Sequence, residues 1–400
     1  RNTSAGVEIE VDGTSGALAR FVAQIRKNPP PLARIQAITS EDIPPQFFKK
    51  FEIITSLSSP GDFLPVSPDI STCPECLKEM WNPADRRFRY PFINCTNCGP
   101  RFTIVREIPY ARPLTTMAGF PLCPDCASEY HDPKNRRFHA QPIACPVCGP
   151  RVSFQVDGSV LAEGEGAIQT ARTWLKDGKI IAIKGLGGFL LACDATNPNA
   201  VAELRKRKKR SDKPFALMAF DLSAIEQHCS VSASEKELLT SIERPIVILR
   251  RKADSNIAEQ CAPNQHTLGL MLPYTPLHSL VLEPAPGFPQ VLVMTSGNLS
   301  EEPIAFEDED AILRLGHLAD AFLTHNRPIH MRMDDSVTGM YASQPAILRR
   351  ARGYAPSPIL LPGDYPSILA TGAELKNTFC LTRQNQAFLS HHIGDLENFE

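Results

Sequence analysis

The chain has 400 residues, of which 42% are hydrophobic, and a formal net charge of −2. This length predicts two to four domains with enough apolar residues to form real cores. The near-neutral charge argues against a general affinity for nucleic acids or membrane surfaces. No run of about 18 apolar residues occurs, so the sequence predicts no membrane-spanning helix.

The first part of the chain predicts the end of a small α+β unit. Residues 6–13 alternate apolar and polar side chains like a strand, and residues 14–28 have apolar side chains at helical spacing. One strand and one helix are too few for a domain, so we expect residues 1–37 to be a remnant whose preceding part is missing. Residues 38–72 are expected to form a connector with short strand-like pieces.

Four CxxC pairs follow, separated by 18, 24 and 18 residues. The second half of this stretch repeats the first at an offset of 50, with 14 identities in 32 positions that include the segments RRF and CGPR. CxxC lets two thiolates from one turn bind a metal, and two such pairs make a closed tetrahedral zinc site. We therefore predict two structural zinc sites in a duplicated module at 73–153. The eight ligands are Cys73, Cys76, Cys95, Cys98, Cys123, Cys126, Cys145 and Cys148.

Other roles for these cysteines fit less well. Disulfides are expected in secreted proteins, but no stretch of the sequence has the pattern of a signal peptide, and the core is large enough without them. Redox-active pairs would have no evident task in so regular a ladder. The repeat favours one zinc in each half, although interleaved pairing stays open. The four other cysteines are scattered, which is typical of a reduced, cytoplasmic protein.

Residues 164–355 predict a mixed α/β domain. Continuous apolar strands alternate with helices, which indicates a sheet covered by helices. Strands are expected at 180–185, 214–220, 244–251, 290–297 and 346–351, and helices at 166–177, 199–209, 222–228, 233–241, 276–283 and 308–316. Residues 369–400 begin a further unit that is too short to finish a fold, so we expect the chain to be a piece of a longer protein.

Cationic and small polar residues occur where several of these strands end. Lys184 opens the glycine-rich turn KGLGG, which exposes backbone N–H groups to a phosphate. The basic run at 205–213 has a solvated helix face as its default interpretation, yet it leads directly into a buried strand. Ser296 and Asn298 end another strand, and 327–336 and 349–353 add charged groups. Together they favour a site for an anionic nucleotide with its Mg²⁺.

Several segments of this domain together resemble the HypF family, the carbamoyltransferases of [NiFe]-hydrogenase maturation. They are KGLGGFLLACDATN, RKRKKRSDKPFALM, RPIVILRR, LGLMLPYTPLH, MTSGNLSEEP, HNRPIHMRMDDS and RRARGYAP. The order of parts is similar too: an acylphosphatase-like tail, paired four-cysteine modules, a YrdC-like domain with a twisted mixed sheet at 164–355, and the start of a TsaD-like domain at 369–400. The resemblance implies a multidomain α+β and α/β protein.

The segment RNTSAGVEIEVDG resembles the acylphosphatase signature, in which Asn2 would orient the attacking water. The phosphate-binding loop and arginine of that family lie upstream of its signature, so this remnant is expected to be inactive. The alternative is that Asn2 is simply a turn residue.

The resemblance implies three reaction steps. Carbamoyl phosphate is hydrolysed to carbamate, carbamate and ATP give carbamoyl-adenylate, and the carbamoyl group passes to the C-terminal cysteine of HypE. Ser296 and Asn298 would hold the carbamate. The ATP phosphates would contact Lys184, Lys208, Arg210, Lys213, Arg350 and Arg352. This chain is expected to stop at the adenylate, because the metal-binding histidines of the TsaD-like domain lie beyond residue 400.

Two other functions stay open at this point. A YrdC-like enzyme could make threonylcarbamoyl-adenylate for tRNA modification, but the zinc ladder and the acylphosphatase-like tail argue against it. A zinc-dependent RNA-binding module could use the basic run at 205–213. That role is disfavoured because the net charge is negative and no aromatic residues alternate with the basic ones.

Overall fold

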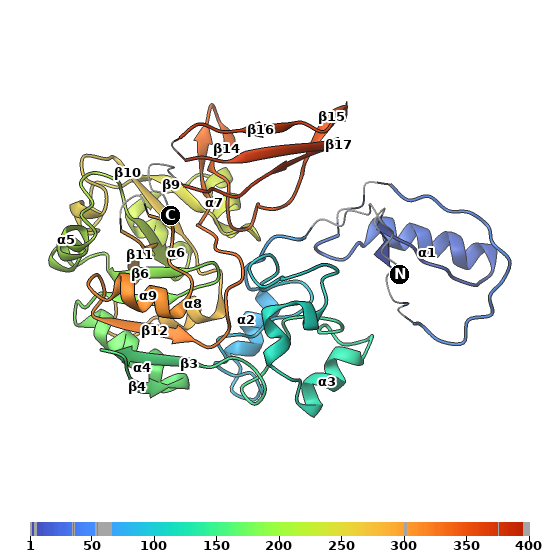
Figure 1. Cartoon of the computed structure of the whole chain (residues 1–400), viewed down its shortest axis with the longest axis horizontal. Coiled ribbons are helices and arrows are strands. Elements are labelled where there is room, and N and C mark those ends of the chain that lie inside the picture. Colours follow the sequence, from blue (N-terminus) through green and yellow to red (C-terminus); the bar gives the residue numbers. More distant parts are fainter. Residues whose placement is uncertain are drawn as a thin grey trace. The chain divides into compact units, whose positions relative to one another are not determined.

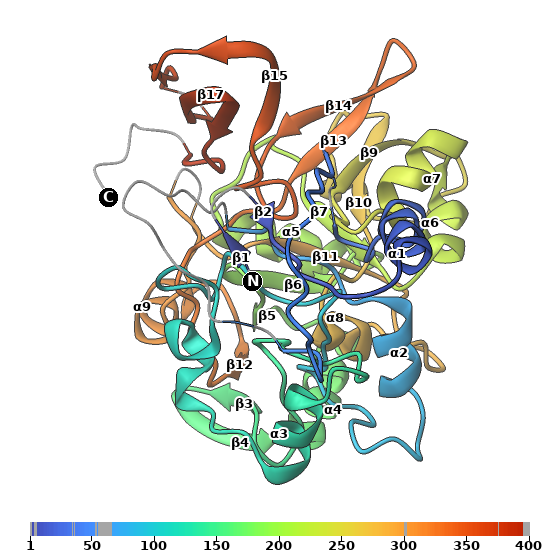
Figure 2. The same cartoon turned by 90° about the vertical axis from the view of Figure 1, so that its right-hand side faces the viewer.

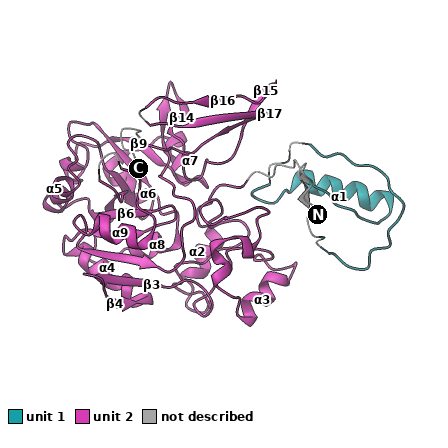
Figure 3. Ribbon diagram, in the orientation of Figure 1, with its two compact units in different colours: residues 1–65 teal, residues 66–400 magenta. Residues whose placement is uncertain are grey.

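The computed structural model describes residues 2–3, 6–33, 35, 37–52, 54, 66–299, 302–374 and 376–394. The chain divides into two compact units, residues 1–65 and 66–400 (Figure 3). Each is described by itself.

The first unit contains a short β-ladder and one helix. Strand β1 (Asn2–Thr3) pairs antiparallel with β2 (Gly6–Val7), and α1 (Ser15–Lys27) confirms the helix expected at 14–28. The prediction of a strand over 6–13 is wrong beyond Val7. Among the described residues of this unit, no further strand pairs with the backbone of residues 8–13. The prediction for the Asn2 side chain lies outside what the structure describes.

The second unit begins with the duplicated cysteine module. Its two helices, α2 (Pro74–Met80) and α3 (Pro124–His131), occupy equivalent places in the two repeats, and two short 3-10 helices, η1 (Arg112–Leu114) and η2 (Thr116–Gly119), lie between them. Each α-helix has a cysteine as its N-cap and a proline at its first position, where the missing N–H costs nothing. The rest of the module consists largely of turns, so tertiary contacts and metal must hold it together (Figure 1).

A 12-stranded mixed sheet forms the centre of the second unit. In spatial order its strands are β14 (Gln344–Arg349), β13 (Val337–Tyr341), β9 (Ile246–Arg251), β10 (Thr267–Met271), β7 (Ala216–Ala219), β11 (Val291–Ser296), β6 (Phe189–Asp194), β5 (Ile181–Lys184), β12 (Ala321–His325), β3 (Val152–Val156) and β4 (Ser159–Glu163), with β8 (Cys229–Ser230) paired to β9. Three neighbouring pairs are parallel (β10 with β7, β12 with β5, β13 with β9) and the others are antiparallel. The sheet starts before residue 164, because β3 and β4 extend its β12 edge.

Helices cover this sheet close to where the sequence placed them. They are α4 (Gly164–Lys176), α5 (Pro198–Arg207), α6 (Leu222–His228), α7 (Ala233–Thr240), α8 (Pro276–Val281) and α9 (Asp308–Leu315), with the 3-10 helix η3 (Glu259–Cys261). Side-chain caps explain the accuracy at several starts, such as Asn197 before α5 and Asp221 before α6. Leu191, Leu217 and Val293 of the central strands are fully buried, so the core lies between sheet and helices.

A separate three-stranded sheet ends the described chain. Its order is β15 (Ile359–Tyr365), β17 (Phe379–Leu389) and β16 (Leu369–Thr371). Figures 1 and 2 both show it apart from the large sheet, beyond β14. Many of its apolar side chains are exposed, Leu369 by 63%.

Candidate functional site

The eight predicted zinc ligands form two clusters. Within each cluster, all four Sγ atoms lie within 4.8 Å of one another. Neighbouring Sγ atoms are 3.6 to 3.8 Å apart in the first cluster and 3.7 Å apart in the second. A tetrahedral zinc with Zn–S bonds of about 2.3 Å places its thiolates about 3.8 Å apart, so both clusters fit structural zinc. Members are grouped by repeat: Cys73, Cys76, Cys95 and Cys98 in one, and Cys123, Cys126, Cys145 and Cys148 in the other.

The two repeats exchange arginine side chains. Arg136 Nη2, from the second repeat, donates to Cys76 Sγ in the first cluster at 2.7 Å, and Arg86 Nη2 donates to Cys126 Sγ in the second at 3.2 Å. Glu79 and Glu129 orient these guanidinium groups by ion pairs of 2.9 and 2.7 Å. Four thiolates around Zn²⁺ carry an excess of two negative charges, which a neighbouring guanidinium partly neutralises. The RRF identity of the repeats was visible in the sequence, but not this role.

The next arginine of each RRF segment connects the repeats mechanically. Arg87 and Arg137 are almost fully buried, and their Nε atoms donate to the carbonyls of Ala144 at 2.9 Å and Asn94 at 3.0 Å in the opposite repeat. Arg87 also pairs with Glu129, and Arg137 with Glu79. The duplicated module is therefore one interlocked body.

Lys208, Ser296 and Asn298 meet at the end of the central strand β11, and their binding of substrate stays a prediction. Lys208 Nζ donates to the carbonyls of Ser296 at 2.7 Å and Asn298 at 2.5 Å, and to Asn298 Oδ1 at 3.0 Å. Ser296 Oγ donates to the same Oδ1 at 2.8 Å. Burial, helped by the positive charge of Arg210, lowers the pKa of Lys208 to about 7. Lys208 follows α5 and Ser296 ends β11, so the sheet brings together residues far apart in the chain.

Two glycine-containing turns pack against each other beside this cluster. Gly297 N donates to the Phe189 carbonyl at 2.7 Å, and a Cβ at Gly297 would lie 2.7 Å from that oxygen. A Cβ at Gly187 would lie 2.5 Å from the Met333 carbonyl oxygen. These positions therefore require glycine for close backbone approach, and they hold the KGLGG turn and residues 296–298 at the same edge.

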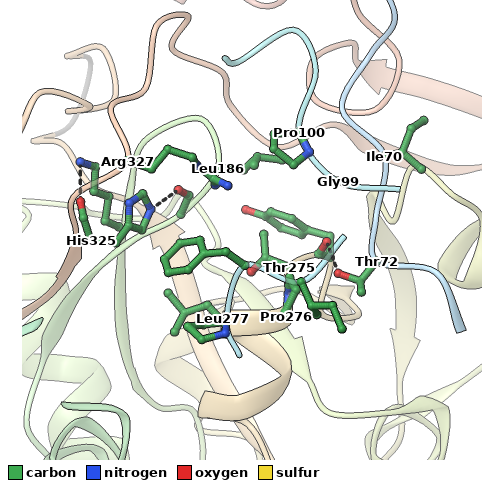
Figure 4. Close-up of a pocket in the computed structure, with 16 residues that line it drawn as sticks. Ile70, Thr72, Gly99, Pro100, Leu186, Thr275, Pro276, Leu277, His325 and Arg327 are labelled. Atoms are coloured by element: carbon green, nitrogen blue, oxygen red, sulfur yellow. Dashed lines mark hydrogen bonds between the residues drawn. The ribbon is translucent and has the colours of Figure 1, made fainter. Parts of the chain in front are cut away.

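Lys184 bonds to a different set of groups. Its Nζ lies 2.5 Å from Asp308 Oδ1 and donates to the His325 carbonyl at 3.0 Å. The side chain is 1% exposed, and burial lowers its pKa although Asp308 opposes this. Lys184 lines a narrow cavity that Arg327 also lines (Figure 4). Sequence reasoning missed Asp308 and His325; an acidic residue at a helix start has no signal that separates it from ordinary helix capping.

Arg210 lies at the start of β7 beside exposed Lys213. Its Nε and Nη2 donate to the carbonyls of Lys213 and Pro214, each at 2.8 Å. Burial, together with the charges of Arg205 and Arg349, lowers the pKa of Arg210 to about 10. Both residues therefore lie just before the first residue of β7, and their contact with a nucleotide stays a prediction.

Arg350 and Arg352 bind protein groups. Arg350 donates to the Leu389 carbonyl at 2.9 Å and so connects the small C-terminal sheet to the domain. Arg352 is 2% exposed, pairs with Asp335 at 2.7 Å, and lies over the Tyr274 ring at 3.4 Å. Burial opposes the charge of Arg352, but Asp335 and Tyr274 raise its pKa. These contacts describe structural roles, and the predicted role in nucleotide binding stays a prediction for both residues.

Comparison with known proteins accounts for each part of the chain. Family models match the acylphosphatases at residues 1–53, the HypF finger at 72–105 and 122–155, the family described as telomere recombination (Sua5, YciO and YrdC) at 173–351, and the HypF Kae1-like domain at 363–400. Within the described residues, no helix is both long and apolar enough to cross a membrane.

Named relatives match along the whole chain. Carbamoyltransferase HypF of Synechocystis sp. is 48% identical over 407 residues, covering 100% of this chain and 52% of the relative. Its counterpart from Rhizobium leguminosarum bv. viciae is 47% identical, with 100% and 51% covered. The chain spans about half the length of these curated relatives.

Two solved structures match with the same coverage. The crystal structure of full-length HypF in the phosphate- and nucleotide-bound form has a TM-score of 0.93 and 50% identity, over 99% of this chain and 52% of that one. That of T. kodakarensis HypF has a TM-score of 0.90 and 44% identity, over 99% and 50%. The fold, the paired cysteine clusters and these similarities agree, and the chain belongs to the HypF family.

Proposed function

We propose that this chain carries the adenylating step of a carbamoyltransferase, in which carbamate and ATP form carbamoyl-adenylate and pyrophosphate. The observation that supports it is the buried Lys208 held by Ser296 and Asn298 at the end of β11. A cation fixed beside small polar groups suits a reaction that builds up charge on a phosphate. Lys208 is fully buried and its Nζ already makes three hydrogen bonds to Ser296 and Asn298, so in this proposal it acts through its charge and by fixing residues 296–298.

The reaction is a displacement at the α-phosphorus. A carbamate oxygen forms the new bond to phosphorus, and the bond to the β-phosphate bridging oxygen breaks, with its electrons leaving on pyrophosphate. In this proposal Ser296 and Asn298 orient the carbamate, and Lys208 stabilises the charge on the α-phosphate. Arg210 and Lys213 neutralise the departing phosphates, which arrive as the Mg²⁺ complex of the substrate ATP. Lys184, Arg350 and Arg352 bond to protein groups, and their direct contact with the phosphates stays a prediction.

The complete pathway belongs to the longer protein that the family comparison indicates. Carbamoyl phosphate as the source of carbamate, with Asn2 in the acylphosphatase-like part, is supported by the family match at 1–53. Transfer to the C-terminal cysteine of HypE would use the Kae1-like domain, whose family model matches residues 363–400. Twelve free cysteines, eight of them in zinc-type clusters, support a reducing, cytoplasmic location.

Isotope exchange between ATP and pyrophosphate tests the proposal. We expect exchange that depends on carbamate, and Lys208→Ala to lower it about 100-fold or more, since removing one preorganised electrostatic group has that effect. Ser296→Ala is a smaller change that tests the same site. Lys206→Ala is the matched control, because Lys206 lies on the exposed side of α5.

Three results would contradict the proposal. Exchange unchanged in Lys208→Ala would place the reaction elsewhere. Exchange that requires threonine would indicate threonylcarbamoyl-adenylate synthesis. A folded, zinc-loaded chain without any exchange would show that this part of the protein does not adenylate by itself.

A further inference from the structure

A narrow cavity lies where the first cysteine repeat meets the edge of the large sheet (Figure 4). Phe92 and Gly99 line it from the repeat, and Lys184, Gly185, Tyr274 and Arg327 line it from the sheet domain. Its volume of about 30 Å³ is room for about two water molecules. Apart from Lys184, no residue assigned to the adenylation step lines this cavity.

Arg327 has an unusual environment in this cavity. The residue is only 6% exposed, and its guanidinium lies 5.2 Å from the centre of the Phe92 ring. Within the part of the chain that the structure describes, no hydrogen bond or ion pair satisfies the guanidinium. A guanidinium has five N–H donors, and the Arg327 nitrogens are not among the fully enclosed unpaired atoms, so they can be reached from the cavity. Burial lowers the pKa of Arg327 only to about 10, so the group is cationic at neutral pH.

Within the described residues, no carboxylate bonds directly to this charge. Lys184 adds a second cation, and its Asp308 partner lies only 2.5 Å from its Nζ. Asp69 stabilises the charge of Arg327 through space: its Oδ1 accepts from the backbone N–H of Arg101 at 2.7 Å and from Thr103 Oγ1 at 2.8 Å, and its buried Oδ2 has no hydrogen-bond partner. His325 also lines the cavity. Burial lowers its pKa well below the usual value, and its Nε2 donates to the Gly185 carbonyl at 3.3 Å, so the unpartnered Nδ1 of the neutral ring is an acceptor. The donors that the cavity offers to an anion are therefore those of Arg327.

Size and geometry restrict what this anion can be. The planar fork of a guanidinium matches a carboxylate through two parallel hydrogen bonds. The small volume excludes nucleotides and amino acids. We propose that the cavity binds a planar one-carbon oxyanion, carbamate or bicarbonate, on Arg327. The inference rests on the proposed function, which makes carbamate a substrate, and it adds a holding site separate from Lys208.

Anion-dependent stability, measured without ATP, tests this site. Urea unfolding of the zinc-loaded chain is followed in sodium bicarbonate, freshly dissolved ammonium carbamate or sodium nitrate, with sodium chloride and sodium phosphate at matched ionic strength as controls. A ligand at ten times its Kd lowers the unfolding equilibrium constant about 11-fold. We expect this for the planar anions and not for chloride or phosphate. The more stabilising of carbamate and bicarbonate at equal concentration identifies the occupant, and equal effects assign the shared carboxylate.

Variants of Arg327 distinguish a built site from general salt effects. Arg327→Met is expected to fold at least as stably as the wild type without anion, because it removes an unpaired buried charge, and to lose the 11-fold effect. Arg327→Lys keeps the charge but not the fork, so it should keep only part of the effect. Arg106→Met is the matched control, because Arg106 is an exposed arginine in the same module. Stabilisation by every anion, or stabilisation that persists in Arg327→Met, would mean an adventitious ion only and would overturn the inference.

The same experiment separates this inference from the proposed function. Lys208→Ala should abolish exchange while keeping the anion effect. Arg327→Met should raise the carbamate KM of exchange about tenfold with little change in kcat, as for loss of an interaction made before the transition state. Stabilisation by the planar anions without ATP–pyrophosphate exchange would support the Arg327 site and refute adenylation by this chain. Exchange without stabilisation by the anions would support adenylation and refute the Arg327 site.

Discussion

Removal of one exchanged arginine should weaken one zinc site and spare the other. Arg136→Gln deletes the donor 2.7 Å from Cys76 Sγ, although Arg137 still pairs with Glu79. A charge-assisted hydrogen bond contributes about 1.5–3 kcal/mol. The Arg136 side chain is 29% exposed, which favours a value near 2 kcal/mol, equivalent to about a 30-fold loss of affinity. In other metalloproteins, mutating a residue that hydrogen-bonds to a metal ligand lowers metal affinity about 10- to 100-fold, which agrees with this value.

Zinc release to a chromogenic chelator measures the effect, with alkylation of the freed thiols and peptide mapping to identify the cluster. In Arg136→Gln, one zinc equivalent should leave about 30-fold faster, and the newly alkylated residues should be Cys73, Cys76, Cys95 and Cys98. Arg86→Gln should expose the other cluster with a smaller effect, because its contact is longer at 3.2 Å. Arg106→Gln is the control. Equal acceleration of both equivalents, or none, would refute the argument that each guanidinium serves the opposite repeat.

Further predictions concern charge, packing and burial in the sheet domain. Because the pKa of Lys208 falls from 10.5 to about 7 on folding, the unfolded chain binds an extra proton between about pH 7 and 10.5, so stability rises with pH across that window. Urea unfolding should show about 2 kcal/mol more gain from pH 7 to 9 in the wild type than in Lys208→Met; parallel curves would contradict the shift. Gly187→Ala should lower the free energy of unfolding by more than 2 kcal/mol, because its Cβ would clash with Met333. Gly119→Ala is the control and should change stability little, because nothing lies within 4 Å of its Cβ. Equal denaturation midpoints for the two variants would show that the turn can shift to accept the methyl group. Arg352→Met should lower the free energy of unfolding by about 3–5 kcal/mol, because it leaves Asp335 without its ion-pair partner. Arg349→Met is the control and should cost about 0.5 kcal/mol or less. Similar losses in the two variants would argue against the pairing of Arg352 with Asp335.

Local chemistry in the sequence determined much of this protein. The CxxC spacing identified both zinc clusters, because a metal needs only a few ligands on short turns, and the repeat indicated which belong together. Helix positions followed from apolar periodicity, and the structure shows caps that fix two of the starts, Asn197 and Asp221. The sequence placed Ser296 and Asn298 at the end of an apolar strand, and the structure brings Lys208 to the same place; their binding roles stay predictions.

Only the tertiary structure decided which charged groups meet. The strand expected at 6–13 failed beyond Val7, since a strand depends on a partner that its own residues do not specify. Spacing along the chain could not show that Arg136 crosses to Cys76, or that Arg352 lies against Tyr274. It also could not distinguish Arg327, which lacks an acceptor among the described residues, from Arg314, which pairs with Glu302 and Asp310. The physical reason is that burial and pairing of a charge depend on groups far away in sequence, whereas periodicity and turn chemistry depend on neighbours.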